Sequence, residues 1–221
     1  MNKFLSTLLV FGVVLSSVAS ADLTRVEVGA GAWIQTPAGD MNIGQISDET
    51  EEAKAYVWAL MKHPVPVIPN LRVEYTSVLS SNKITSLEIK QYDLIPYYNI
   101  LDNTGWITID LGLDFKVINA SEELSGNQTD STVLPMGYAR TRFQLPLSGL
   151  AAEADIKYIS FSDNTAYDAR AKLDYTFTSF PVIEPAIEIG YRVQKFETDE
   201  LLGYKMNMEF EGIYLGLMVR F

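Results

Sequence analysis

Apolar and polar residues alternate with a period of two along most of the chain. The clearest run covers residues 106–117, where isoleucine, leucine, phenylalanine and valine occupy one set of alternate positions and mostly charged or small residues occupy the other. The same alternation recurs over 167–177, 187–194 and 72–76. Successive side chains of a β-strand point to opposite faces, so these runs predict strands with one apolar and one polar face.

Weaker runs of the same kind complete a set of predicted strands. The set covers residues 23–35, 54–63, 71–80, 86–99, 106–118, 133–145, 151–162, 166–180, 186–197 and 204–221. Strands of about 10 residues with alternating faces, joined by turns, are typical of a transmembrane β-barrel. The sequence therefore predicts an all-β fold, a transmembrane, antiparallel, up-and-down β-barrel of about ten strands. A barrel of about eight strands is the alternative, if 54–63 or 133–145 is not a strand.

Residues 47–62 fit this pattern least well. Ala53, Tyr56, Val57, Leu60 and Met61 lie at helical spacing, and the acidic residues after Ser47 resemble a helix start. A helix would leave 62–70 as the return strand, and the three prolines of that segment argue against it. We therefore expect a strand from about residue 54, and a helix over 47–62 stays open as the alternative.

The prolines divide the junctions between strands into two kinds. Seven of the nine lie at or beside the junctions after the second, fourth, sixth and eighth strands: Pro64, Pro66, Pro69, Pro96, Pro146, Pro181 and Pro185. The other junctions are polar and include the longer segments 36–53 and 119–132. In bacterial barrels the short turns face the periplasm and the longer loops face the outside. We expect the proline-rich turns and both termini on the periplasmic side.

The first 21 residues have the three parts of a secretory signal peptide. A basic start, an apolar stretch over 4–18 and the small residues 19–21 follow one another. The apolar stretch is shorter than the roughly 20 residues that a membrane-spanning helix needs. We expect 1–21 to be removed and 22–221 to form a single barrel domain.

Composition excludes several classes of function. The chain has no cysteine, so disulfides and thiolate metal sites are excluded. With 17 Lys and Arg against 28 Asp and Glu its formal charge is −11, and it becomes −12 when Lys3 leaves with the signal peptide. So acidic a protein is a poor candidate for binding nucleic acid or anionic lipid.

Two kinds of barrel fit the alternation, and they place the polar face differently. A soluble barrel of the lipocalin kind, such as a periplasmic binding barrel, has its apolar face inside, and a membrane barrel has it outside. In a membrane barrel the lumen would hold ten basic and nine acidic residues: Arg25, Arg72, Lys116, Arg140, Arg142, Lys157, Arg170, Lys172, Arg192, Arg220, Glu27, Glu74, Asp110, Asp114, Glu153, Asp155, Asp168, Asp174 and Glu188. This near balance supports the membrane alternative, because charges away from bulk water need partners.

Aromatic and small residues add two further predictions. Aromatic residues near strand ends predict interfacial girdles: Trp33, Trp58, Tyr97, Tyr98, Trp106, Tyr158, Tyr167, Phe177 and Phe221. Gly29 and Gly31, which no helix follows, are not a nucleotide-binding loop. We expect them to leave room for large inward side chains.

The end of the chain resembles a known assembly signal. Ile213, Leu215, Leu217, Val219 and Phe221 share one face, expected to meet lipid, while Arg220 faces the lumen. This stretch resembles the closing strand of bacterial outer-membrane proteins, which the barrel-assembly machinery recognises. The resemblance implies that Phe221 and the apolar residues behind it are an assembly signal.

The whole mature chain looks like a small outer-membrane β-barrel protein of Gram-negative bacteria. The stretches "AYVWALMKHPVPVIPNLRVEYT" and "YDLIPYYNILDNTG" look like a family of small barrels known only by their location. The resemblance implies a protein of the outer membrane, surrounded by its lipid and lipopolysaccharide, that meets the barrel-assembly machinery during insertion. It brings no catalytic, cofactor or ligand residues and leaves the oligomeric state open.

The chain offers little catalytic chemistry. His63 is its single histidine and lies in the turn after a predicted strand, which argues against a histidine-based hydrolase. Carboxylate pairs such as Asp110 with Asp114 and Glu153 with Asp155 share one face with as many basic residues. We interpret them as ion-paired filling of the lumen, and expect no enzymatic activity, cofactor or metal.

Barrel size limits transport. Side chains just fill a barrel of about eight strands, whereas open channels have about 16 to 18, which argues against a general porin. The sequence predicts a non-enzymatic structural or surface component of the outer membrane. A narrow channel or small-ligand transporter, and a soluble periplasmic binding barrel, are the alternatives.

Overall fold

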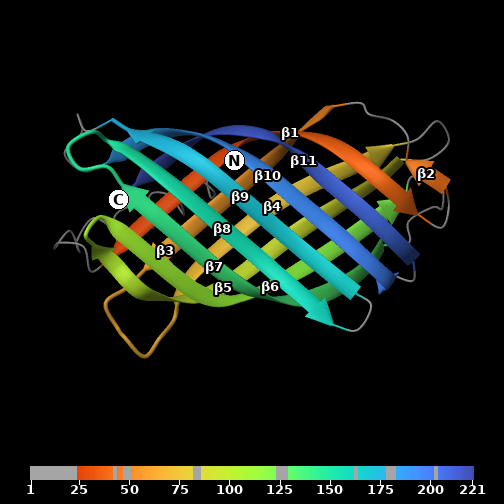
Figure 1. The fold of residues 1–221 in the computed structure, drawn as a ribbon, viewed down its shortest axis with the longest axis horizontal. Coiled ribbons are helices and arrows are strands. Elements are labelled where there is room, and N and C mark those ends of the chain that lie inside the picture. The colour runs from red at the N-terminus through yellow and green to blue at the C-terminus, as the bar shows by residue number, and fades with distance from the viewer. Residues whose placement is uncertain are drawn as a thin grey trace, which may run out of the picture.

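A computed structural model describes residues 24–41, 44–46, 51–81, 86–122, 129–161, 164–177, 183–201 and 204–221. Its strands are β1 (Arg25–Met41), β2 (Gly44–Ile46), β3 (Glu52–Lys62), β4 (Asn70–Ser81), β5 (Ser86–Thr104), β6 (Ile107–Glu122), β7 (Thr129–Gln144), β8 (Leu150–Phe161), β9 (Asn164–Thr176), β10 (Glu184–Leu201) and β11 (Tyr204–Arg220). All but β2 pair in chain order, and β11 returns to pair with β1 (Figure 1). Within these residues the chain is a closed antiparallel barrel of ten strands, and β2 pairs with β1 alone.

The predicted all-β up-and-down barrel of ten strands is confirmed. Both segments that could have reduced the number of strands are strands, β3 over 52–62 and β7 over 129–144, so the eight-strand alternative is wrong. The helical alternative is also wrong over 52–62, while 47–50 lie outside the described residues. No helix in the described ranges is long and apolar enough to cross a membrane.

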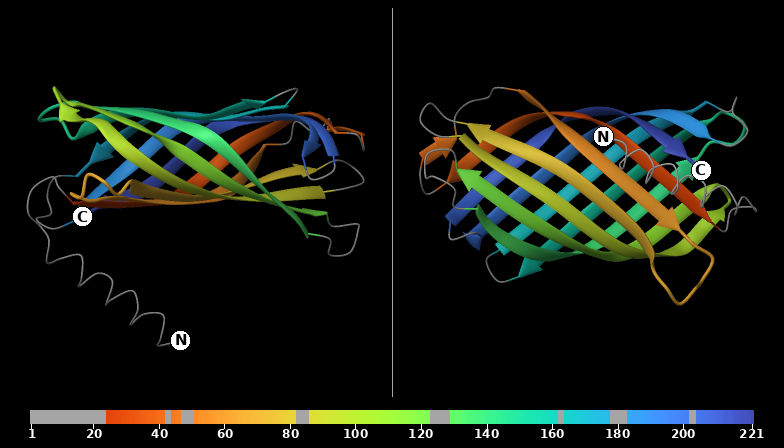
Figure 2. Two further views of the ribbon diagram at one scale, coloured as in Figure 1. Left: turned by 90° about the horizontal axis from the view of Figure 1, so that it is seen from below. Right: turned by 180° about the vertical axis from the view of Figure 1, so that it is seen from behind.

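The two ends of the barrel differ. The start of β1, the end of β11 and the turns 63–69, 105–106 and 145–149 lie at one end, here called the terminal end, and the opposite end is the loop end (Figure 2). The prolines of 63–69 and Pro146 lie in terminal-end turns, as predicted. Pro181 lies outside the described residues. Pro185 is the second residue of β10 and so lies beside its junction, as predicted, whereas Pro96 lies well within β5 and not at a junction.

Pro96 changes the pairing around it. It pairs with Leu71 of β4 on one side, but the ladder between β5 and β6 has no partners between Leu94 and Tyr97. Proline has no backbone N–H to donate, which accounts for the interruption.

Several strands extend further toward the loop end than predicted. β1 continues to Met41, β6 to Glu122, and β7 already starts at Thr129, so these strands take up much of the predicted loops 36–53 and 119–132. Backbone pairing continues there although the side chains no longer alternate between apolar and polar. The alternation of apolar and polar residues therefore identifies only the part of each strand whose two faces have different surroundings, and not the whole strand.

The closing seam between β1 and β11 depends on glycine. Gly31 pairs with Gly216, and a Cβ atom at Gly31 would lie 2.1 Å from the backbone oxygen of Leu215 and 2.7 Å from the Tyr56 hydroxyl. A Cβ atom at Gly29 would lie 2.4 Å from the indole nitrogen of Trp58. The prediction that these glycines leave room for large inward side chains is confirmed.

We expect Gly31→Ala to destabilise the barrel by about 1–3 kcal/mol, because its methyl group would meet the backbone across the seam. Gly137→Ala is the matched control, since the nearest atom to a Cβ there is the Tyr158 oxygen at 3.6 Å. Urea unfolding of both variants in detergent micelles measures the difference. Equal stability of the two would show that the seam tolerates a side chain.

Candidate functional site

The lumen concentrates the charged residues of the barrel. Charged side chains that are buried among the described residues are Glu27, Arg72, Glu74, Asp93, Asp110, Asp114, Lys116, Arg140, Arg142, Glu153, Asp155, Lys157, Asp168, Arg170, Lys172, Asp174, Glu188, Arg192 and Arg220. They occupy the face that the sequence assigned to the lumen, and Arg25, less buried, pairs with Glu27 at the rim. The polar face that the sequence predicted for the lumen is therefore a buried face of the described barrel.

Asp93 is the one member of this set that the sequence prediction missed. Its neighbours Tyr92 and Leu94 are exposed on the outside of β5, so the alternation was present. The predicted strand 86–99 contains Asp93, but the set of lumen charges read from that strand did not include it. With Asp93 and Arg25 included, the lumen contains ten acidic and ten basic residues.

Near the terminal end, arginines bind carboxylates from several strands. Arg142 pairs with both oxygens of Asp174 at 2.6 and 2.9 Å, and also lies 3.0 Å from Glu153. Arg140 joins Glu153 to Asp110 at 2.7 and 2.6 Å. These charge-assisted bonds connect β6, β7, β8 and β9 across the interior.

The middle of the lumen is organised around shared carboxylates. Glu74 accepts hydrogen bonds from Arg72 at 2.5 Å, Lys157 at 2.6 Å and Arg170 at 2.6 Å. Lys157 continues the network to Asp93 at 2.7 Å. A carboxylate with three cationic donors needs no bulk water to satisfy it.

A second shared carboxylate lies closer to the loop end. Asp168 accepts from Arg192 at 2.6 and 2.8 Å, from Lys116 at 3.3 Å and from the Gln194 amide at 3.2 Å. Gln194 also exchanges hydrogen bonds with Gln91 at 2.7 and 2.9 Å. At this level the amide side chains of Gln91 and Gln194 thus occupy the lumen together with the charged groups.

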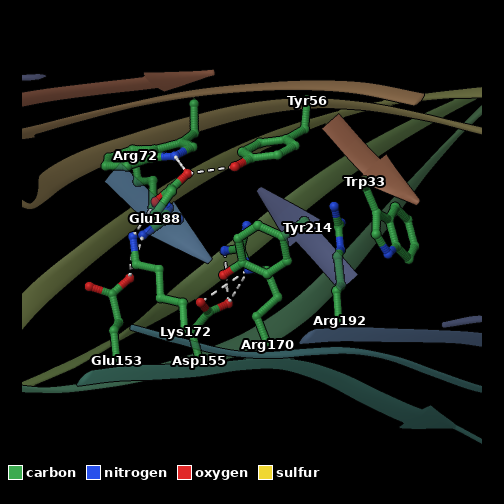
Figure 3. Close-up of a pocket in the computed structure, with 11 residues that line it drawn as sticks. Trp33, Tyr56, Arg72, Glu153, Asp155, Arg170, Lys172, Glu188, Arg192 and Tyr214 are labelled. Carbon is green, nitrogen blue, oxygen red and sulfur yellow. Dashed lines mark hydrogen bonds and ion pairs between the residues drawn. The ribbon is translucent and has the colours of Figure 1, made fainter. Parts of the chain in front are cut away.

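Aromatic side chains complete the ionic part of the lumen (Figure 3). Glu188 accepts from the Tyr56 hydroxyl at 2.7 Å, the Trp58 indole at 3.2 Å and Lys172 at 2.8 Å. The guanidinium of Arg72 lies 4.9 Å from the centre of the Trp58 ring. These aromatic rings act as partners of charged groups.

The predicted aromatic girdles are partly wrong. Trp33, Trp58 and Tyr97 point into the lumen and are at most 2% exposed. The exposed members of the predicted set are Tyr98, Trp106, Tyr158, Phe177 and Phe221. The buried rings share the parity of the charged residues, and the glycines of β1 provide the space for Trp58.

Little free space remains in this network. The cavity drawn in Figure 3 has a volume of about 10 Å³, about that of one water-sized sphere. Its walls include Trp33, Glu153, Arg170 and Arg192. At this level the side chains close the lumen.

Asp114 is an exception to the pairing. It is fully buried on β6, and neither of its carboxylate oxygens has a hydrogen-bond partner within the described residues. It lies opposite the interrupted stretch of β5 at Pro96. The prediction of ion-paired lumen filling is confirmed for Asp110, Glu153 and Asp155 but not for Asp114.

The lumen becomes apolar toward the loop end, which the sequence prediction missed. Seven strands, β4, β5, β6, β7, β8, β10 and β11, contribute apolar side chains beyond their last charged lumen residue. Buried members are Val78, Ile89, Ile118, Met136, Phe196, Met208 and Phe210, with Leu134 and Ile159 packed against them. We call these nine residues the apolar layer. The inward faces thus change from ionic to amide to apolar along the barrel axis.

The outer surface is uncharged over a broad belt. The belt starts at the terminal end, and its upper edge is marked by Ile34, Tyr92, Val117, Tyr158 and Ile213. Within it, no outward position on any strand of the described barrel is Asp, Glu, Lys or Arg. Large apolar side chains in this belt are freely exposed, for example Leu113 at 55% and Leu217 at 68%. Charges reappear on the outer face only closer to the loop end.

Catalytic chemistry is not apparent in the described residues. The ring of His63 is used by its own turn, since Nδ1 accepts from the backbone N–H of Val65 at 3.2 Å and Nε2 lies 3.1 Å from the oxygen of Pro69. The interpretation of His63 as a turn residue is confirmed. In the ranges that the structure describes, no group of three or more His, Cys, Asp or Glu residues could hold a metal ion.

Comparisons with known proteins give only distant likenesses. No protein-family model and no curated protein matches the chain. The crystal structure of a Pseudomonas aeruginosa FadL homologue is 8% identical over 90% of this chain and 89% of that one, with a TM-score of 0.35. The P. putida toluene transporter TodX is 8% identical over 91% and 90%, with a TM-score of 0.32. Likenesses this weak carry no argument, so the function must be inferred from the chain's own residues.

We expect Arg142→Met to destabilise the barrel by about 3–5 kcal/mol, because it removes a guanidinium that two buried carboxylates share. Lys195→Met is the control, because Lys195 pairs at 3.1 Å with a Glu197 side chain that is 53% exposed, and such surface pairs contribute about 0–1 kcal/mol. Urea midpoints in the same detergent compare the two. A similar small loss for both would mean that the network adds no net stability.

Proposed function

We propose that the chain is an integral outer-membrane β-barrel protein, a non-enzymatic structural or surface component whose lumen is closed by ion pairs. The observation that carries this proposal is the inverted polarity, with an uncharged belt outside and paired charges inside. In water the belt would be a large exposed apolar surface, whereas in lipid it is favourable. A soluble periplasmic barrel would have the opposite arrangement.

The height of the belt suits a bilayer. The lipid-facing row of β11 runs from Ile213 to Phe221. At a rise of about 3.3 Å per residue and a tilt of about 40°, this row spans roughly 20 Å along the barrel axis. That is close to the apolar band of about 25 Å found in outer-membrane barrels.

Membrane orientation and assembly are part of the proposal. The terminal end, with its short turns, faces the periplasm, and the loop end faces outward into the lipopolysaccharide layer. The row of Ile213, Leu215, Leu217, Val219 and Phe221 serves as the signal for the barrel-assembly machinery. Removal of residues 1–21 as a signal peptide belongs to the same proposal.

We expect Leu113→Lys to impair insertion into liposomes and to destabilise the inserted barrel by about 2–4 kcal/mol, because it places a charge in the middle of the belt. Asn119→Lys is the matched control on the same face of the same strand, beyond the belt. Resistance of the folded band to heating on gels and flotation with liposomes measure insertion. If Leu113→Lys folded as well as wild type and stayed in the soluble fraction, the soluble barrel would replace our proposal.

We expect no ion conductance in planar bilayers, because buried and mutually paired charged side chains surround the cavity of about 10 Å³ in the middle of the lumen. The same bilayer measurement on Arg142→Ala tests whether removing one cation from the lumen opens a path for ions. Steady single-channel currents from the wild-type barrel would favour the narrow-channel alternative over a structural component.

Transport of a small ligand is the second candidate function. It is favoured by an apolar pocket of about 390 Å³ at the loop end, which the ionic network does not occupy.

A further inference from the structure

The barrel wall is incomplete between β7 and β8 toward the loop end. Their ladder runs from Gln144 and Ala151 to Gly137 and Tyr158 and stops there. Beyond this point β7 stays paired with β6 as far as Thr129, and β8 stays paired with β9 as far as Phe161. Two strands that remain well paired on their other sides therefore separate from each other.

A pocket of about 390 Å³ lies where the two strands separate. Its walls come from β7, β8, β9 and β10: Leu134, Pro135, Ile159, Phe161, Asn164, Thr165, Ala166, Phe196 and Glu197. Three of them, Leu134, Ile159 and Phe196, belong to the apolar layer. The pocket is thus a gap beside the apolar layer of the lumen, above the ionic network.

The pocket lies at the break in the wall. Leu134 and Ile159 have the parity of the lumen residues, whereas Pro135 has the parity of the outer belt. Both residues of β7 lie beyond Gly137, where the ladder to β8 has already stopped. Pro135 contributes to the break, because it has no N–H with which to continue pairing.

Its lining suits an uncharged apolar molecule. Glu197 is the only charged residue in the lining, and it pairs with Lys195 at 3.1 Å. The Thr165 hydroxyl lies 3.3 Å from that of Ser160. Binding pockets of about 300–1,000 Å³ with mostly apolar walls and few polar groups are typical of small-molecule sites.

We propose that this pocket binds one small, uncharged, apolar molecule, aromatic or aliphatic, and that the molecule reaches it through the gap between β7 and β8. The proposal rests on the membrane location proposed above. Tyr158 lies at the upper margin of the uncharged belt, so the gap opens where the apolar region of the membrane ends. A molecule dissolved in the lipid can therefore reach the pocket without crossing the ionic network.

The test uses the full chain reconstituted in liposomes and the uncharged fluorophore N-phenyl-1-naphthylamine. The background signal comes from probe that partitions into the lipid. It rises linearly with probe concentration, and liposomes without the barrel measure it. We expect an additional saturable component of one probe per barrel, and none with the anionic analogue 8-anilinonaphthalene-1-sulfonate, which carries a charge into an apolar site. A purely linear signal, or equal saturable binding of the charged analogue, would overturn the proposal.

Two variants on β9 locate the site. Ala166→Phe fills the pocket, because Ala166 is a buried part of its wall, and should weaken saturable binding at least about tenfold. Ala169→Phe adds the same side chain on the outer face and should leave binding within about twofold. Unchanged binding by Ala166→Phe would overturn the assignment.

The gap is tested with single cysteines, since the chain has none of its own. Pro135→Cys and Ala139→Cys both lie on the outer face of β7, and a bulky maleimide is attached to each, with the mass confirming the reaction. We expect modification at position 135 to abolish or greatly slow binding and modification at 139 to have little effect. Equal binding by both modified proteins would overturn access through the gap.

Liposome flotation and heat-modifiable migration accompany every variant. A wild-type chain that does not insert refutes the proposed membrane function. A chain that inserts but shows no saturable binding refutes only the pocket.

Discussion

Mutual pairing of buried charges is the constraint on which this barrel depends. A charge removed from water is tolerated when an opposite charge and further hydrogen bonds replace the solvent. Here the partners come from strands far apart in the chain, as when Lys157 and Arg170 meet Glu74, 83 and 96 residues away. A slip of one residue in any strand would turn its charges toward lipid and its apolar side chains toward the lumen. The network therefore specifies the register of the strands as well as filling the interior.

The change of polarity along the axis divides the lumen into two parts with different properties. Shared carboxylates such as Glu74 and Asp168 hold the larger part closed, and the rings of Trp33 and Trp58 pack against its cations. In the apolar layer, packing depends on the shapes of the side chains, because no ion pairs hold facing strands together there. Space therefore collects in the apolar layer, next to the place where β7 and β8 part.

Alternation alone predicted much of the fold, because a β-strand between lipid and a charged lumen has two very different surroundings. It identified ten strands and all but one of the buried charged residues. It could not identify strand ends beyond the belt, where both faces are similar. The position of aromatic residues near strand ends misplaced Trp33, Trp58 and Tyr97 in the girdles, since aromatic residues occur both at membrane interfaces and, paired with cations, inside. The apolar layer was missed because inward apolar residues at strand tips, such as Val78 and Phe196, interrupt the polar parity that the prediction relied on. The pocket depends on a ladder that ends early, which only the three-dimensional pairing reveals.

The seam between β1 and β11 sets the order in which the barrel can form. It joins the two ends of the chain, and the ion pair between Arg220 and Glu27 crosses it over 193 residues of sequence. Every other strand pairs with a neighbour in sequence and can form as a local hairpin, whereas the seam requires the whole sheet to be curved already. Closure is therefore the last step, and until it occurs β1 and β11 are two open edges that would pair with other chains. The longer the seam takes to close, the longer these two edges stay available to other chains.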